Sequence, residues 1–459
     1  MGEPRVKVSR ELKPQIGTWQ LWAIAVGLVI SGEYFGWSFG WGVSGTLGFL
    51  LSVLLITVLY ITFIFSYTEL TTAIPHAGGP FAYSKRAFGD AGGFLAGFAT
   101  LVEFVFAPPA IALSIGAYVN FLFPAVSAIV VAVIAYFVFV GINLLGVKIA
   151  ASFELVVTIL AVVELLVFIG VVAPGFKVEN FTKDGFMGGI PGIFAAIPFA
   201  IWFFLAIEGV AMSAEEVKNP KKTIPRAYIS GMLTLAALAL GVMIFAAGVG
   251  DWKALASQNS PLPEAMKMYF GGQNGWTFML GFIGVFGLIA SFHGIILGYS
   301  RQIFALARAG FLPAGLSKVS KSFQTPHWAL VAGGVVGVVS VLCEIPFPGV
   351  TGSLITMSAM GAVLMYLISM ASLFRLRKTD PTMERPFKAP LYPVFPAIAI
   401  GLSAVALAAM VWFNLVLTAI LLVILALGWG YFILTHRQRA AAPFDEMMEL
   451  TGTASENAE

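Results

Sequence analysis

Residues 30–37 read ISGEYFGW and lie inside the first long apolar segment of the chain. Ser31 and Gly32 loosen a helix at this point, and the carboxylate of Glu33 follows them directly. In the hydrocarbon core of a membrane, an ionisable group persists mainly where it faces a cavity, an ion or a ligand, and irregular backbone is tolerated under the same condition. The stretch therefore predicts a broken membrane helix that lines a binding site for something small and cationic.

The composition of the whole chain is that of a helical membrane protein. Of its 459 residues, 59% are hydrophobic and 11% are charged, whereas a soluble protein of this size carries about a quarter charged residues. The single cysteine, Cys343, excludes an intrachain disulfide framework. No metal-ligand spacing, nucleophile elbow or phosphate loop is present in the sequence, which predicts no cofactor, no metal and no enzymatic activity. The net charge of +3 comes from the basic residues of the loops and does not indicate a nucleic-acid partner.

The hydropathy of the chain predicts twelve transmembrane helices in an all-α polytopic membrane protein. All but four of the 26 Lys and Arg residues fall in loops on one side of the membrane, and such an excess marks the cytoplasmic side. We therefore expect both termini in the cytoplasm, and compact loops favour the plasma (inner) membrane of a prokaryote. The apolar windows, roughly 20 residues each, begin near Ile16, Gly45, Ala91, Pro124, Ala150, Pro191, Ala227, Trp276, Trp328, Val350, Val394 and Asn414.

Segments one and six of this series share a pattern. The first carries the interruption described above, and in the sixth Pro198 removes a helix donor while Gly209 follows a second carboxylate, Glu208. Interrupted helices at matching places in two halves are the signature of an inverted-repeat transporter, whose site lies between them at the midplane. Ordinary kinks in a channel or receptor are the alternative, which two carboxylates at corresponding breaks disfavour.

The domain organisation follows from these segments. We expect a transporter domain at residues 16–439, preceded by a cytoplasmic segment at 1–15 and followed by a disordered cytoplasmic tail at 440–459, which is acidic and poor in large apolar residues. The inverted repeats are expected at about 16–173 and 191–374, with two extra helices at about 394–435.

The predicted cytoplasmic loops resemble those of the amino acid–polyamine–organocation (APC) superfamily. This resemblance covers nearly the whole chain and implies a five-plus-five inverted-repeat (LeuT-like) fold, with broken helices one and six, that transports by alternating access. The matching stretches are PHAGGPFAY (75–83), AFG (87–89), EG (208–209), AEEVKNP (214–220), IPRA (224–227), SR (300–301), ALARAG (305–310), LP (312–313) and TP (325–326).

Helix one departs from the amino-acid carriers that the chain resembles. They usually carry a run such as Gly-Ser-Gly-Ile-Phe, whose amides hold the substrate carboxylate at a positive helix end. Here Ile30 replaces the first glycine, and Glu33 stands where an apolar residue is usual. Glu33 would repel a substrate carboxylate, so we expect an amine without a carboxyl group. The stretch SGEYFGW (31–37) resembles the ethanolamine permease branch, which implies ethanolamine import; an amino-acid or polyamine permease is the alternative.

A small ammonium requires oxygen acceptors or aromatic faces. Glu33 is the first candidate counter-ion, with a helix-capping role as its alternative. Glu208 is expected to face substrate or to act as a proton-coupled gate, with a structural acid as its alternative. Trp202 is expected to stack on the cation, with ordinary packing as its alternative. The predicted substrate-binding residues are Ser31, Gly32, Glu33, Tyr34, Glu103, Trp202, Glu208, Ser291 and His293.

The coupling ion stays open at this level. Glu208 and His293 are the coupling candidates. Many APC members carry a lysine in segment five. The corresponding position of this chain is near Ala161, between Glu154 and Glu164, and that span contains no lysine. Proton symport, sodium symport and uniport all remain, because an inside-negative potential alone favours uptake of one positive charge by about 2.3 kcal/mol per 100 mV. The expected partners are an ethanolamine-like amine, a co-transported proton or sodium ion, and the lipid bilayer.

Overall fold

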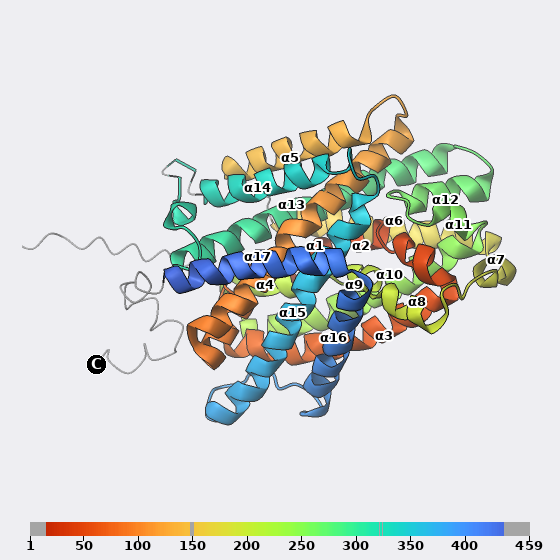
Figure 1. Ribbon diagram of the computed structural model, residues 1–459. Helices are drawn as coiled ribbons and strands as arrows, with labels where there is room; N and C mark the ends of the chain where they lie inside the picture. Colours follow the sequence, from red (N-terminus) through yellow and green to blue (C-terminus); the bar gives the residue numbers. More distant parts are fainter. Residues whose placement is uncertain (1–14, 147–150, 321, 324, 436–459) are drawn as a thin grey trace, which may run out of the picture.

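The computed structural model describes residues 15–146, 151–320, 322–323 and 325–435, and this part of the chain is helical without strands (Figure 1). Nearly all of the predicted N-terminal segment, the whole predicted tail, and basic residues used for the orientation, such as Lys148 and Lys321, lie outside it. In chain order the helices are α1 (Thr18–Val29), α2 (Ser31–Tyr34), α3 (Ser38–Ala73), α4 (Pro80–Leu122), α5 (Ala128–Leu144), α6 (Ala151–Val172), η1 (Ala173–Gly175), α7 (Val178–Thr182), α8 (Gly189–Ala195), α9 (Ile197–Trp202), η2 (Ile207–Glu216), α10 (Pro220–Gly248), α11 (Trp252–Leu255), α12 (Pro261–Phe270), α13 (Gly275–Arg308), η3 (Ala314–Ser317), α14 (His327–Leu342), α15 (Val350–Thr379), α16 (Val394–Phe413) and α17 (Leu415–Leu434).

Nine helical segments in the described residues are long and apolar enough to cross a membrane. Three further apolar helices, α1, α5 and α14, have between 10 and 17 residues and are shorter than a full span. The structure thus confirms an all-helical membrane protein, while the exact number of twelve spans stays a prediction. Large apolar side chains of α17 such as Val416 and Leu434 are exposed, as expected for a helix on the lipid-facing surface.

Both predicted interruptions occur in the structure. The first apolar segment ends as α1 at Val29, makes the single turn α2, and resumes as α3 at Ser38. In the sixth segment, α9 ends at Trp202, and the chain continues as the 3-10 helix η2 after Ala206, which has a φ of 78°. Pro198 is not at this interruption, because it lies in the first turn of α9, where a missing N–H is tolerated.

Two long helical elements each join two helices across a kink at a glycine, at or close to a segment boundary that the hydropathy predicts. In α3, Gly45 has a φ of 70° and a ψ of 175°, and Gly89 interrupts α4 with a φ of 74°. A side chain at Gly45 would press against the backbone of Gly185, whose carbonyl accepts a hydrogen bond from the Leu47 amide at 2.7 Å. The kink at Gly45 therefore separates the second half of segment one, which begins at Ser38, from segment two, at the boundary that the hydropathy predicts.

The loop that fills the bend of α3 is also tied to α11. Lys253 Nζ lies 2.6 Å from Asp184 Oδ2, and this hydrogen bond and charge hold the pKa of the Asp184 carboxyl below its usual value. The Trp252 indole donates to the Lys183 carbonyl at 2.9 Å. These contacts cover the end of the bundle at which α3 begins.

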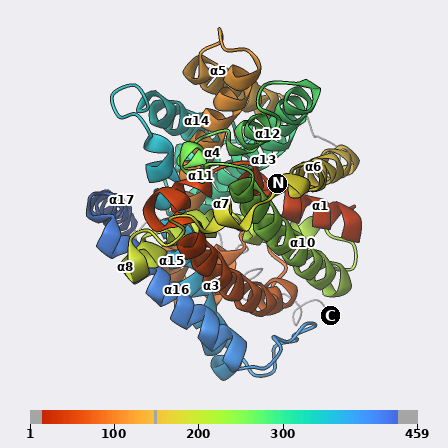
Figure 2. The ribbon, with the colours of Figure 1, turned by 90° about the vertical axis from the view of Figure 1, so that its right-hand side faces the viewer.

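Small residues allow the central helices to approach closely. A Cβ atom at Gly361 of α15 would lie 2.7 Å from the Glu103 amide nitrogen of α4, and the Ser358 hydroxyl donates to the Glu103 carbonyl at 2.8 Å. Such small-residue contacts are how membrane helices gain packing energy without a hydrophobic driving force. The two perpendicular views show α5 and α16 on opposite sides of the bundle (Figures 1 and 2).

Candidate functional site

The two interrupted helices cross at their breaks. A Cβ atom at Gly32 would collide with the carbonyl oxygen of Trp202, and one at Gly209 would lie 3.1 Å from a methyl group of Leu28. Because Gly32 follows Leu28 and Trp202 precedes Gly209, the two segments run antiparallel with their irregular parts at the same level. This crossing produces the broken-helix geometry that the sequence predicts for a binding site.

Glu33 is fully buried at this crossing. Both of its carboxylate oxygens lack a hydrogen-bond partner within the described residues. Its backbone carbonyl accepts a hydrogen bond from the Trp37 indole at 3.0 Å, and no side chain caps the start of α3. The carboxylate therefore caps no helix here, and a charge in such surroundings needs a proton or a cation for compensation.

Aromatic rings enclose the crossing. The Trp202 ring meets Phe35 edge to face with ring centroids 5.4 Å apart, and its indole nitrogen is buried without a partner in the described structure. Trp37 stacks on Phe203 at 6.2 Å and contacts Trp41 at 4.8 Å. Trp202 is 2% exposed, so it lies at the breaks and does not face lipid.

Ser31 and Ser291 lie together at the first break. Their hydroxyl oxygens are 2.8 Å apart, and the Ser291 hydroxyl donates to the Leu28 carbonyl at 2.7 Å. A helix end exposes carbonyls that need donors, and here α13 supplies one. The pair therefore joins α13 to the end of α1.

Glu103 and Glu208 form a second acidic group. Both residues are buried and their carboxyl groups interact across α4 and η2, while both Glu103 oxygens lack a hydrogen-bond partner in the described residues. The Tyr366 hydroxyl lies 3.3 Å from both Glu208 carboxylate oxygens and 2.7 Å from the Tyr60 hydroxyl. Two adjacent carboxyl groups in a dry site share a proton at lower cost than they hold two charges. No hydrogen bond of the described residues connects this pair to Glu33.

His293 lies apart from the breaks. Its Nδ1 is 3.2 Å from the Asn143 amide nitrogen, and its ring packs on Phe139, so it faces α5. Residues two positions apart lie on different faces of a helix, and Ser291 occupies the face toward α1. The structure therefore groups Ser31, Gly32, Glu33, Trp202 and Ser291, places Glu103 with Glu208, and separates His293 from both groups.

The Tyr34 side chain contacts Glu164, a residue that is not among the site residues predicted from the sequence. Its hydroxyl donates to Glu164 Oε2 at 2.5 Å, and its carbonyl accepts from the Tyr118 hydroxyl at 2.9 Å. Glu164 is 3% exposed. A carboxylate within the apolar segment five was the available signal, whereas nothing in the sequence pointed to Tyr118 or to Tyr366.

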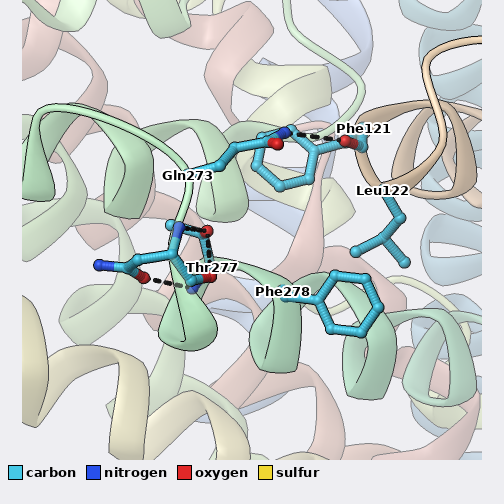
Figure 3. Close-up of a pocket in the computed structure, with 6 residues that line it drawn as sticks. Phe121, Leu122, Gln273, Thr277 and Phe278 are labelled. Atoms are coloured by element: carbon cyan, nitrogen blue, oxygen red, sulfur yellow. Dashed lines mark hydrogen bonds between the residues drawn. The ribbon is translucent and has the colours of Figure 1, made fainter.

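A surface hollow of about 250 Å³ lies where α4 ends and α13 begins (Figure 3). None of the predicted site residues lines it, and the Gln273 amide crosses it to donate to the Phe121 carbonyl at 3.1 Å. Tyr118 lies one helical turn from this hollow along α4. The hollow is lined by Phe121, Leu122, Gln273, Asn274, Thr277 and Phe278.

A polytopic helical bundle whose two interrupted helices meet around unpartnered polar groups defines a membrane transporter. The chain belongs to the amino acid permease family, whose model matches residues 16–427. It is 24% identical over 416 residues to the branched-chain amino acid permease BcaP of Bacillus subtilis (strain 168), covering 85% of this chain and 87% of that protein. It is 26% identical over 363 residues to the methylthioribose transporter of the same strain, covering 74% and 75%. An uncharacterized transporter of Rhizobium meliloti (strain 1021) is 27% identical over 419 residues, covering 88% and 87%. The protein is thus a secondary transporter and not an enzyme.

Proposed function

We propose that this permease imports a small organic amine without a carboxyl group, with ethanolamine as the best candidate. The observation that carries the proposal is the buried Glu33 carboxylate, which has no donor within the described residues and lies where the two breaks cross. An ammonium group supplies both the missing charge and the missing hydrogen bonds. The face of Trp202 adds about 0.5–2 kcal/mol when it lies against a desolvated cation.

The charge of Glu33 also argues against a zwitterionic substrate. Two like charges 4 Å apart repel by about 4 kcal/mol at the effective dielectric constant found near protein surfaces. An amino acid held at this break would bring its carboxylate close to Glu33. The hydroxyl of an amino alcohol meets no such penalty and matches Ser31 and Ser291, which already exchange a hydrogen bond.

For the architecture, we propose that the short apolar helices α1, α5 and α14 complete twelve spans in the plasma (inner) membrane, with both termini cytoplasmic. The five-plus-five inverted repeat occupies residues 16–173 and 191–374, and α16 and α17 are the extra helices. Alternating access then moves the site between the two sides, with a proton or sodium ion as the co-transported partner. The antiparallel crossing of the breaks at Gly32 and Gly209 supports this arrangement.

An amino-acid permease is the second candidate, because one relative is named a branched-chain amino acid permease. A polyamine permease is the related alternative, since a diamine needs two acidic ends. Glu33 and the Glu103–Glu208 pair offer two separate acidic groups.

Uptake of labelled ethanolamine into proteoliposomes distinguishes these candidates. The competition panel consists of choline, diamines, alanine and arginine. Competition by small monoamines alone supports the amine permease, while diamine competition favours the polyamine alternative. Inhibition by alanine or arginine, or the absence of ethanolamine uptake, contradicts the proposal and leaves the fold unaffected.

Glu33→Gln tests the counter-ion directly. The substitution removes the charge and keeps the size, so we expect amine affinity to fall about 10–100-fold, as for the loss of a charge-assisted hydrogen bond worth roughly 1.5–3 kcal/mol. The measurement is a binding titration on purified protein of unchanged thermal stability. Glu179→Gln, at an exposed position of α7, is the matched control. Unchanged amine affinity in Glu33→Gln rules out the counter-ion role.

A further inference from the structure

The side chain of Tyr34 crosses from the first break to α6. Its ring lies against Gly284 and Gly287 of α13, where added Cβ atoms would come within 3.2 Å and 2.8 Å of ring carbons. The Tyr34 hydroxyl donates a hydrogen bond to Glu164 at 2.5 Å, and the Tyr118 hydroxyl donates one to the Tyr34 carbonyl. Tyr34 follows Glu33 directly in the sequence, so the turn α2 joins two buried carboxylates.

Glu164 has no compensating positive charge among the residues that the structure describes. It is 3% exposed, its Oε1 has no hydrogen-bond partner, and no basic side chain of the described residues pairs with it. Tyr34 and Tyr118 are the titratable groups that face it from α2 and α4. The other titratable groups on α6 and on the helices packed against it have different neighbours. Glu154 lies beside Gly27, Glu264 pairs with Lys267, and Arg301 pairs with Glu216. His293 contacts Asn143, Tyr228 donates to the Glu208 carbonyl, Tyr299 donates to the Leu330 carbonyl, and the first two turns of α10 contain Lys221, Lys222 and Arg226.

We infer that Glu164 is the proton-binding site that couples amine transport to the proton gradient, an inference that rests on the proposed function. When an ammonium ion neutralises Glu33, Glu164 remains an uncompensated charge inside the membrane. Protonation removes that charge: an O–H bond of a hydronium ion breaks as an O–H bond forms on the Glu164 carboxylate, one water molecule is left, and the carboxyl group keeps its hydrogen bond to Tyr34. The occluded state then carries one ammonium ion and one proton, and release of both on the inner side gives symport.

The hollow between α4 and α13 lies about two turns of α13 away from this site. Along α13, Thr277 lines the hollow, Gly281 meets Leu122, and Gly284 meets Tyr118 and Tyr34. At about 1.5 Å per residue, the hollow ends roughly 10 Å from the level of Gly284.

The donor set favours a proton over a metal ion. The described residues contain no group of three or more His, Cys, Asp or Glu side chains that could hold a metal. Glu164 offers one free oxygen, and its neighbour Tyr34 is a neutral donor. A sodium or calcium site would require several oxygen ligands around the ion.

Infrared difference spectroscopy without substrate tests proton binding at Glu164. We expect wild-type protein to show a protonated carboxyl band that titrates with pH, that Glu164→Gln abolishes and that Tyr34→Phe shifts in frequency. Glu154→Gln, a matched change on the same helix, is expected to retain the band. A wild-type band that persists unchanged in Glu164→Gln overturns the assignment. Because no amine is present, this result does not depend on the proposed substrate.

Uptake at a clamped membrane potential tests the coupling. One coupled proton supplies about a tenfold change in steady-state accumulation per pH unit. We expect this dependence of accumulation on pH in wild type and in Glu154→Gln. In Glu164→Gln we expect the pH dependence to be lost while exchange of amine across the membrane is retained. A response in Glu164→Gln equal to that of wild type, or wild-type uptake driven by a sodium gradient alone, overturns the inference. If Glu164→Gln does not fold, Tyr34→Phe keeps the carboxyl and must alter the pH profile of uptake; an unaltered profile counts against coupling.

Discussion

Five glutamate carboxylates are buried in the described part of the chain, and their surroundings differ. Within the described residues, the oxygens of Glu33 and Glu103 have no hydrogen-bond donor, Glu164 has one tyrosine, and Glu208 has a tyrosine and the nearby Glu103 carboxyl group. Only Glu69 is compensated by arginine, through Arg377 and Arg385. A buried carboxylate with arginine partners acts in structure, whereas those without them need a ligand, a proton or an ion. The difference in partners therefore separates Glu69 from the buried acids for which we propose a role in transport.

Trp202→Leu tests the aromatic contribution to substrate binding. The face of a tryptophan contributes about 0.5–2 kcal/mol to a bound cation, or roughly 2–30-fold in affinity. We expect the largest loss for choline-like and alkylated amines, whose charge is spread over methyl groups that cannot donate hydrogen bonds. Binding titrations with a series of amines measure it, with Trp412→Leu, 76% exposed at the end of α16, as control. An equal loss for every amine would instead indicate a packing role for Trp202.

At the scale of elements, the sequence predicted where the interruptions and the kinks lie, but not what holds the kinks. Ser31, Gly32 and Glu33 signal a break locally, through helix-weakening residues and a charge in an apolar run. The bend at Gly45 depends on contact with Gly185, which is distant in the sequence. No local pattern reports such a contact, although the hydropathy places a segment boundary at the same glycine.

The candidate site was predictable to the same limited extent. A charge or an aromatic residue beside a break can be recognised from the sequence, as for Glu33 and Trp202. The orientation of His293 toward α5 cannot be recognised from the sequence, because α13 is apolar on several faces and packing sets its rotation about its axis. The pairing of Tyr34 with Glu164 likewise requires the fold, since the groove between two glycines of α13 creates it.

Gly32→Ala tests the contact between the two breaks. The added methyl group would collide with the Trp202 carbonyl oxygen, so the breaks must separate. We expect transport to fall at least tenfold, since a misplacement of about 1 Å in a site costs about that much or more. Gly430→Ala in α17, where nothing lies within 4 Å, is the matched control. Wild-type uptake rates in Gly32→Ala would show that the close approach is dispensable.

At the scale of the whole molecule, a network of ion pairs stabilises the end of the bundle at which α3 and α15 terminate. Arg377 Nε donates to Glu69 Oε1 at 2.8 Å, Arg385 Nε lies 3.2 Å from the same oxygen, and the Ala389 amide donates to Oε2 at 2.7 Å. Glu69 thereby joins α3, α15 and the segment that leads into α16. The network connects helices of both proposed repeats to the two extra helices.

Removing Glu69 should therefore destabilise the entire bundle. Glu69→Gln leaves two guanidinium groups without their counter-ion, and breaking a buried ion pair on one side costs about 3–5 kcal/mol. We expect a lower unfolding temperature in detergent, measured by a thermal shift assay. Glu69→Gln combined with Arg377→Gln should recover part of the loss, because one uncompensated charge disappears with the second substitution. Glu384→Gln, in the exposed pair with Lys221, should change the temperature little. Amine affinity should stay the same in every variant that remains folded, since the network makes no contact with Glu33; a selective loss of affinity at unchanged stability would place Glu69 in the transport machinery.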